Sequence, residues 1–249
     1  MARHFRMACA ASLLAIAAPS PASSQDYSIT AGGLYAVGRY GGTDKTEATI
    51  SFVNAQASHA GWQLTATLPY LSAKSEGRLI EVGGILLPGQ GGRVRGFGDV
   101  LVNLERPLKL GEKFPLDVSL GGRIKLPTGA NGISTGHFDY GVDAELSKTF
   151  GQVTPFVKVG YRWYGDSPDL ELRNGWEGSA GARAAVGKAA VVASYDWSES
   201  AYGGPTSKVA YGLVSLPLAQ KWRWIVFGSK GLSAGAPDTL VGLGVTHSF

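Results

Sequence analysis

Ionisable and apolar side chains alternate along three neighbouring segments, approximately residues 114–127, 137–148 and 153–164. The acidic and basic residues on one face of these segments are Asp117, Arg123, Lys125, Asp139, Asp143, Glu145, Lys158 and Arg162. Successive side chains of an extended strand point to opposite faces, so each segment presents one charged face and one apolar face. Unpaired charge is too costly to bury in an apolar core. The charged faces must therefore meet water or one another, and neighbouring segments of opposite sign favour cross-strand ion pairs.

Nucleophilic chemistry has one candidate group, formed by Ser134, His137 and Asp139. A hydroxyl, an imidazole and a carboxylate are the side chains of a hydrolytic triad. A loop separates Ser134 from His137, however, so their spacing fixes no common face. The sequence contains no zinc-spaced cysteines or histidines, no phosphate-binding loop and no calcium loop. We therefore expect no catalytic residue, no bound metal and no cofactor, with a lipid-modifying enzyme acting through this group as the alternative.

The chain after residue 24 divides into about twelve segments of period two, separated by Gly, Pro and Asp. The expected strands are 27–40, 45–56, 61–72, 97–108, 114–127, 137–148, 153–164, 175–186, 189–198, 207–217, 221–230 and 239–249. Connections after the even-numbered segments are tight, such as 187–188 and 218–220, whereas most of those after odd-numbered segments are longer and more polar. Short turns at one rim and long loops at the other are typical of outer-membrane barrels. The fold class predicted is thus an all-β, membrane-spanning, antiparallel up-and-down barrel.

The last strand carries Val241, Leu243 and Val245 at alternate positions and ends on an aromatic residue, Phe249. An apolar outward face with small or polar residues between is what a lipid-facing strand requires. The terminal aromatic resembles the signal by which outer-membrane assembly machinery recognises its substrates, although His247 departs from that pattern. The expected partners are therefore outer-membrane lipid and the assembly machinery, the latter through Phe249.

The first 24 residues have the features of a secretory signal peptide. Basic residues precede an apolar run from Met7 to Ala18, and small residues around Ser24 follow it. The expected domain division is a signal peptide over 1–24 and an outer-membrane barrel over 25–249, in a Gram-negative cell. The only cysteine, Cys9, lies in the signal segment, so no disulfide is expected in the exported chain.

Composition and charge limit the remaining classes of function. The 36 glycines and 10% aromatic residues suit a chain of short strands and turns. The formal charge of +4 includes Arg3 and Arg6 of the signal segment and is spread along the chain. Nucleic-acid binding requires a concentrated basic face, so no nucleic-acid partner is expected.

Aromatic residues near the strand ends predict interfacial belts on the apolar face. This predicted outward set is Trp62, Tyr70, Tyr140, Trp163, Trp176, Tyr195, Trp197, Tyr211, Trp222 and Trp224. The opposite parity predicts the residues that line the lumen. The principal candidates are Asp99, Glu105, Asp117, Arg123, Lys125, Asp139, Asp143, Glu145, Lys158, Arg162, Glu177, Arg183 and Arg223, and the same parity adds Glu47, Asp196 and Lys208.

Three short motifs resemble a known family. They are Gly-Phe-Gly-Asp at 96–99, Lys-Leu-Pro-Thr-Gly at 125–129, and Ser-Thr-Gly at 134–136 followed by Asp139. This pattern resembles the transporter-like outer-membrane family of the meta-pathway of phenol degradation, over roughly residues 62–249. Phe97 departs from it, because an aliphatic residue is commoner there in the family. The resemblance implies a barrel associated with the passage of hydrophobic or aromatic compounds, whereas the residues themselves favour a strand-loop-strand corner without a binding role.

The expected function is an outer-membrane channel or transporter that passes small, hydrophobic or aromatic molecules. A structural barrel with a plugged lumen is the second alternative, beside the lipid-modifying enzyme. The segment 73–96 is unusually apolar for an exposed loop. We expect it either to fold into the mouth as a lid or capture site, or to extend the third and fourth strands.

Overall fold

A computed structural model of the chain describes residues 26–40, 45–75, 80–82, 85–87, 92–108, 116–165 and 170–249. The expected signal peptide and the expected turn around 109–113 lie outside these residues. Within the described ranges the chain is built of strands, and no helix there is long and apolar enough to cross a membrane.

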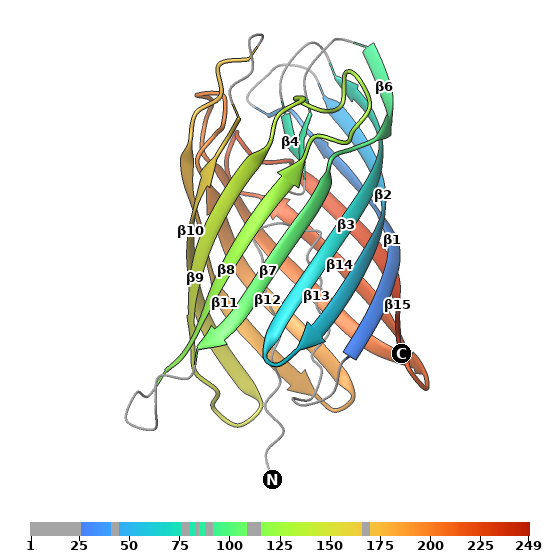
Figure 1. Ribbon diagram of the computed structural model, residues 1–249, viewed down its shortest axis with the longest axis vertical. Helices are drawn as coiled ribbons and strands as arrows, with labels where there is room; N and C mark the ends of the chain where they lie inside the picture. Colours follow the sequence, from blue (N-terminus) through green and yellow to red (C-terminus); the bar gives the residue numbers. More distant parts are fainter. Residues whose placement is uncertain are drawn as a thin grey trace.

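The strands form one closed antiparallel barrel (Figure 1). Their bounds are β1 Asp26–Gly38, β2 Thr46–His59, β3 Trp62–Ser75, β6 Gly92–Phe97, β7 Val100–Leu108, β8 Asp117–Leu126, β9 Asp139–Ser147, β10 Val153–Trp163, β11 Gly175–Val186, β12 Ala189–Ser198, β13 Ser207–Ala219, β14 Trp222–Gly231 and β15 Thr239–Ser248. Apart from β6 and β7, which both pair with β3 and not with each other, each strand pairs with its neighbours in sequence. β1 closes the ring by pairing with β15, with Gly32 opposite Gly244. A short hairpin of β4 Ile80–Val82 and β5 Ile85–Leu87 is separate from this ladder.

β6 and β7 together occupy one place in the barrel, because both pair with β3. The break between them falls at Gly98 and Asp99. A Cβ atom on Gly98 would lie 2.5 Å from Leu71 Cδ1, so only glycine lets the chain pass this close to β3. With β6 and β7 counted as one, the barrel has the expected twelve strands. The expected fourth strand is therefore interrupted where a continuous one was predicted.

Short turns and long loops are sorted between the two rims as expected. The turn between β2 and β3 consists of Ala60 and Gly61, both with positive φ, and Gly187 has a φ of 60° in the turn between β11 and β12. Both ends of the barrel wall, at the start of β1 and the end of β15, lie at the short-turn rim, which is the lower rim in Figure 1.

The outer surface is apolar, as predicted for the alternating strands. Val157, Leu243 and Val241 are 59%, 57% and 54% exposed. Of the predicted aromatic belts, Trp62, Tyr70, Tyr140, Trp163, Trp176, Tyr195, Trp222 and Trp224 are exposed. Tyr211 is a correction: it packs inside, against the buried apolar cluster, because it shares a parity with Leu213.

The inner surface is not uniformly polar, which corrects a second expectation. On β1–β3 and β13–β15 the buried inward positions are uncharged and mix polar with apolar side chains. The apolar ones include Leu34, Ile50, Phe52, Leu71, Leu213, Ile225, Phe227 and Leu240, and the polar ones are Thr30, Thr46, Asn54, Thr65, Thr67, Ser215, Ser229 and Thr246. Glycines on neighbouring strands accept the two rings: a Cβ atom on Gly32 would lie 2.6 Å from Phe52, and one on Gly242 would lie 2.3 Å from Phe227. Period-two alternation could not reveal this, because here both faces of the strand carry apolar residues.

Candidate functional site in the barrel interior

Among the described residues, seven ion pairs lie along the interior wall formed by β7–β11, two of them with the carboxylates of Asp99 and Glu81 from outside these strands, and Glu177 on β11 lies at their centre. Its Oε1 atom is 2.5 Å from Arg123 Nη2, and its Oε2 atom is 2.7 Å from Arg162 Nε. Arg123 is on β8, so its side chain crosses two intervening strands. At those positions stand Gly141 and Gly160, where a Cβ atom would lie 3.2 Å from Arg123 Nε and 3.3 Å from Glu177 Cγ. Glycine therefore provides the space in which this charged network lies.

The network continues towards the short-turn rim with opposite charges on adjacent strands or on strands one apart. Lys158 Nζ on β10 is 2.9 Å from Asp143 Oδ2 on β9, and Arg183 on β11 pairs with Glu145 on β9. Glu105 on β7 has no ion pair with any described residue. These contacts agree with the cross-strand pairing expected from the alternating signs of the segments.

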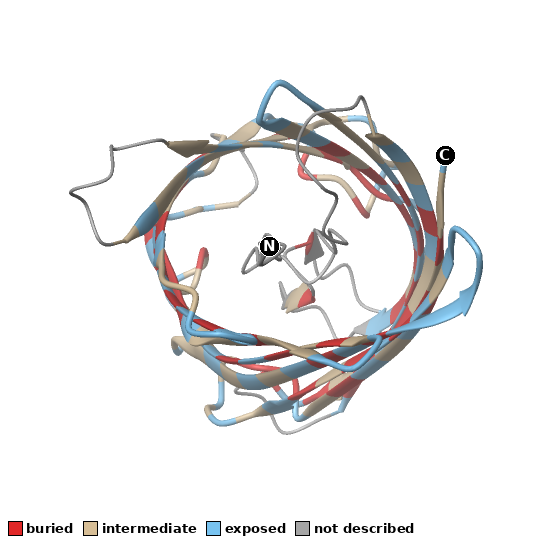
Figure 2. Ribbon diagram, turned by 90° about the horizontal axis from the view of Figure 1, so that it is seen from below, coloured by how far each residue is buried: buried red, intermediate tan, exposed pale blue. Residues whose placement is uncertain are grey.

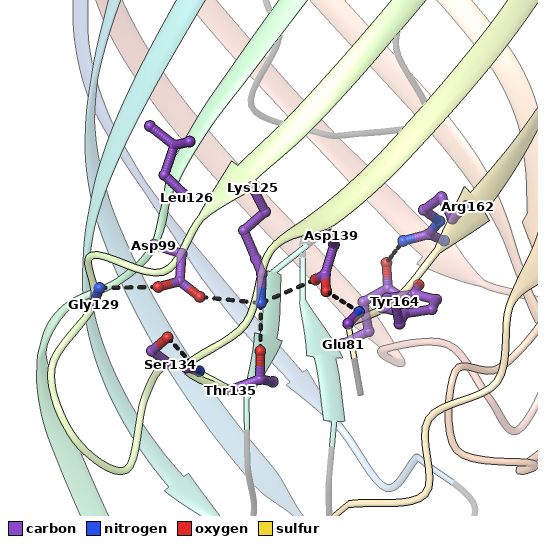
Figure 3. Close-up of polar contacts among 12 residues, drawn as sticks. Glu81, Asp99, Lys125, Leu126, Gly129, Ser134, Thr135, Asp139, Arg162 and Tyr164 are labelled. Atoms are coloured by element: carbon purple, nitrogen blue, oxygen red, sulfur yellow. Dashed lines mark hydrogen bonds and ion pairs between the residues drawn. The ribbon is translucent and has the colours of Figure 1, made fainter. Parts of the chain in front are cut away.

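Towards the loop rim, Lys125 joins three elements (Figure 3). Its Nζ atom is 3.2 Å from Asp99 Oδ2 and 2.9 Å from Asp139 Oδ2, and it donates a 2.5 Å hydrogen bond to Thr135 Oγ1. Lys125 and Asp139 are opposite each other in the β8–β9 register. Thr135, which the sequence did not single out as a partner, comes from the loop between these strands.

The family-like motifs meet at this corner. The Gly129 N–H donates to Asp99 Oδ1 over 2.9 Å, and the Val100 N–H donates to Thr128 Oγ1 over 3.0 Å. A Cβ atom on Gly129 would lie 2.9 Å from the backbone of Gly98. Because every one of these contacts holds the 127–136 loop onto the wall, they agree with the reading of the motifs as a structural corner.

The β4–β5 hairpin supplies a carboxylate to the same wall. Glu81 Oε1 lies 2.5 Å from Arg162 Nη1, and Val82 and Ile85 are buried. β3 and β6 also extend beyond the rest of the wall. The described parts of the segment 73–96 thus include both a hairpin in contact with the inner wall and extensions of the wall strands, whereas residues 76–79, 83–84 and 88–91 lie outside the described residues. A role of the segment as a lid, capture site or gate stays a prediction. Figure 2, which looks along the barrel, shows short strand segments inside the ring.

A small cavity of about 20 Å³, partly open to solvent, adjoins the hairpin. Its lining includes Glu81, Leu101, Arg123, Arg162 and Tyr164. Tyr164 follows the last residue of β10, and burial, with the charge of Glu81 adding to it, raises the pKa of its phenol. The hydroxyl is therefore neutral, and it has no hydrogen-bond partner among the described residues. Alternation places Tyr164 on the same face as Lys158 and Arg162, but nothing in the sequence singled out its hydroxyl as part of a site.

The predicted lumen residues fall into two groups. Those on the inward-facing set of positions are Asp99, Glu105, Asp117, Arg123, Lys125, Asp139, Asp143, Glu145, Lys158, Arg162, Glu177, Arg183, Asp196 and Arg223. Arg223 is apart from the network, on β14, where it donates to Ser215 Oγ. Glu47 and Lys208 are corrections, because both are exposed on the outer face. Both residues lie near a strand end, where a charged side chain is able to face outward beyond the lipid. The alternation of side chains therefore did not show whether they face outward or into the barrel.

The hydrolytic group does not assemble among the described residues. Ser134 Oγ accepts a hydrogen bond from the Gly136 N–H, and Asp139 is bound to Lys125 and the Gly165 N–H. No hydrogen bond joins either side chain to His137 in the described part of the chain.

Solved structures similar to this chain are outer-membrane barrels. The KdgM porin is 11% identical, with a TM-score of 0.53 over 89% of this chain and 99% of the porin. The translocator domain of the autotransporter NalP from Neisseria meningitidis is 14% identical, with a TM-score of 0.54 over 92% and 90% of the two chains. The CymD monoaromatic hydrocarbon channel is 10% identical, with a TM-score of 0.50 over 91% and 89%.

No protein-family model matches the chain, and no curated protein matches it either. At these identities the likeness concerns the fold alone. It establishes that this chain has the barrel architecture of outer-membrane proteins, a fold that proteins described as porins, a translocator and a hydrocarbon channel share.

Proposed function

We propose that the protein is an outer-membrane channel that passes small molecules with an apolar or aromatic body. The observation that carries this proposal is the divided interior of a barrel whose outside is apolar. One inner wall carries paired charges that are compatible with water, and the other carries uncharged side chains, among them the apolar Ile225 and Phe227 and the polar Ser215 and Ser229. A molecule with an apolar body and a polar end has a suitable surface on each side.

Three further observations support this cargo class. Tyr164 offers a neutral hydroxyl beside a cavity, where it is able to bond an oxygen of a small molecule. One of the similar structures is described as a monoaromatic hydrocarbon channel. The motif resemblance to the phenol-degradation family points in the same direction. The charged residues of β7–β11 are proposed to line the passage.

Conductance of the refolded chain in a planar bilayer tests the proposal. We expect discrete channel openings, and we expect a simple phenol added on one side to reduce the current reversibly by occupying the lumen. Swelling of liposomes in phenol solutions gives an independent measure of flux. A barrel that inserts but shows neither conductance nor flux would favour the plugged structural alternative.

Recognition by the assembly machinery is proposed for the carboxy-terminal residue. Phe249 is 62% exposed, and its N–H donates to the Tyr27 carbonyl oxygen at the closing seam. The His247 ring packs between Trp222 and Phe249, at centroid distances of 4.4 and 4.7 Å, so histidine here extends the aromatic row. Deleting Phe249 is expected to lower the amount of barrel assembled in cells and to leave refolding in detergent unchanged.

A further inference from the structure

Three basic side chains gather on the outer face of the loop rim, where β3 pairs with β6. Lys74 lies directly opposite Arg93 in the register, and Arg95 is opposite Ser72. Opposite residues of an antiparallel pair point to the same face. All three basic residues are exposed. We call Lys74, Arg93 and Arg95 the rim cluster.

The described residues around the rim cluster do not neutralise its charge. Like charges placed directly opposite each other destabilise a strand pair. Among the described residues no carboxylate forms an ion pair with a member of the cluster. The nearest acid in the ladder is Glu47 on β2, which is opposite Lys74 and is also hydrogen-bonded to Tyr35. One carboxylate against three bases leaves an excess of positive charge.

The depth of the cluster is set by two aromatic rings on the same face. Tyr70 and Phe97 are opposite each other, 42% and 55% exposed, and their rings meet edge to face at 5.2 Å. Exposed aromatic rings near strand ends mark the level of lipid headgroups. Lys74 is four residues beyond Tyr70, which for a tilted strand places it about 10 Å farther from the bilayer centre. The basic groups are thus at the level of lipid phosphates.

The cluster also has the chemistry that phosphate requires. Two guanidinium groups present forked N–H donors that match phosphate oxygens, and an ammonium adds a point charge. The charged β3–β6 edge projects above the rest of the wall in Figure 1. At the same rim the outward positions of β9–β11 are instead aromatic, with Tyr161 packed against Trp163 and Trp176 at 4.9 Å.

We propose that the rim cluster binds the phosphate groups of an outer-leaflet glycolipid. The site is separate from the passage of cargo, although it rests on the proposed placement of the barrel in the outer membrane. The lipid phosphates would supply the negative charge that the Lys74–Arg93 pair lacks, and the acyl chains would pack against Tyr70 and Phe97.

Binding of diphosphoryl lipid A to the refolded full chain in detergent, followed by native mass spectrometry, tests the site. The variant Lys74→Gln/Arg93→Gln/Arg95→Gln is expected to bind about tenfold more weakly or worse, because each base near a charged lipid surface contributes measurably to binding. Monophosphoryl lipid A should bind the unaltered chain more weakly than the diphosphoryl form.

The matched control removes the same charge at the opposite rim, as Lys148→Gln/Lys188→Gln/Lys221→Gln. It should bind diphosphoryl lipid A like the unaltered chain. Equal losses in both variants, or no loss in the rim variant, would overturn the site. Flotation with vesicles and conductance are measured in parallel: a chain that fails to float overturns the membrane placement and the site with it, whereas a barrel that floats without conducting counts only against the channel.

Discussion

The two halves of this barrel line their interior with different kinds of side chain. On β7–β11 the inner wall carries ion pairs laid over glycines, and the outer wall at the loop rim is aromatic. On β1–β3 and β13–β15 the inner wall is mostly uncharged, with apolar side chains beside Ser, Thr and Asn and with glycines that accept Phe52 and Phe227, and the outer rim carries the basic cluster. In both halves, glycines leave room for a large side chain from a neighbouring strand. Closure alone satisfies the backbone of either half, so the interior chemistry is free to differ.

The largest expected effect comes from breaking the charged half at its centre. Glu177→Gln removes the carboxylate shared by Arg123 and Arg162 and leaves two guanidinium groups without that partner. Loss of one partner of a buried pair costs about 3–5 kcal/mol of unfolding free energy. Urea unfolding of the refolded barrel in detergent measures it. Glu105→Gln is the control, and an equally small shift for both variants would show that the network contributes little to stability.

In the half with the apolar interior cluster, loss of packing should lower the free energy of unfolding. Phe227→Ala empties the space beside Gly242, and large-to-small changes of this kind cost about 3 kcal/mol at the low end of their range. We expect the low end because lumen water is able to enter the hole. Val226→Ala, on the adjacent outward-facing position, is the matched control in the same unfolding assay. A loss at Val226 as large as that at Phe227 would contradict an inner packed wall.

The ion selectivity of the channel should show whether the charged wall of β7–β11 controls which ions pass. The described inner wall of β7–β11 has more carboxylates than bases: Asp99, Glu105, Asp117, Asp139, Asp143, Glu145 and Glu177 against Arg123, Lys125, Lys158, Arg162 and Arg183. A lining of one net sign raises the local concentration of counter-ions. We expect cations to permeate roughly twice as well as anions, from the reversal potential in a potassium chloride gradient.

A paired variant sharpens that measurement. Glu105→Gln/Asp117→Asn removes two carboxylates that have no ion pair among the described residues. The reversal potential should move towards the anion side while the barrel remains folded. Anion preference in the unaltered channel would show that the charged wall does not control the passage.

The sequence was sufficient to predict the strands of both halves of the barrel, but it predicted the inner lining of only one half. Where charges alternate with apolar residues, as in β8–β10, period two determines strand, face and neighbour, because a buried unpaired charge is excluded. On β13 that constraint is absent, so Tyr211 and Lys208 were assigned to the wrong faces. The strand break at Gly98 and the contact of Glu81 with Arg162 depend on tertiary proximity, which local periodicity does not contain.

The smallest effect is expected at Tyr164, where we propose that cargo is bound. Tyr164→Phe removes a hydroxyl that has no partner among the described residues, so unfolding free energy should change by less than about 1 kcal/mol and in the stabilising direction. The same change should weaken block of the channel by phenol and leave block by benzene unaltered, because only phenol carries an oxygen to bond. Conductance titrations with both compounds measure this difference. Equal weakening for both would mean that Tyr164 shapes the cavity instead of recognising an oxygen, and cargo discrimination would then depend on the apolar wall.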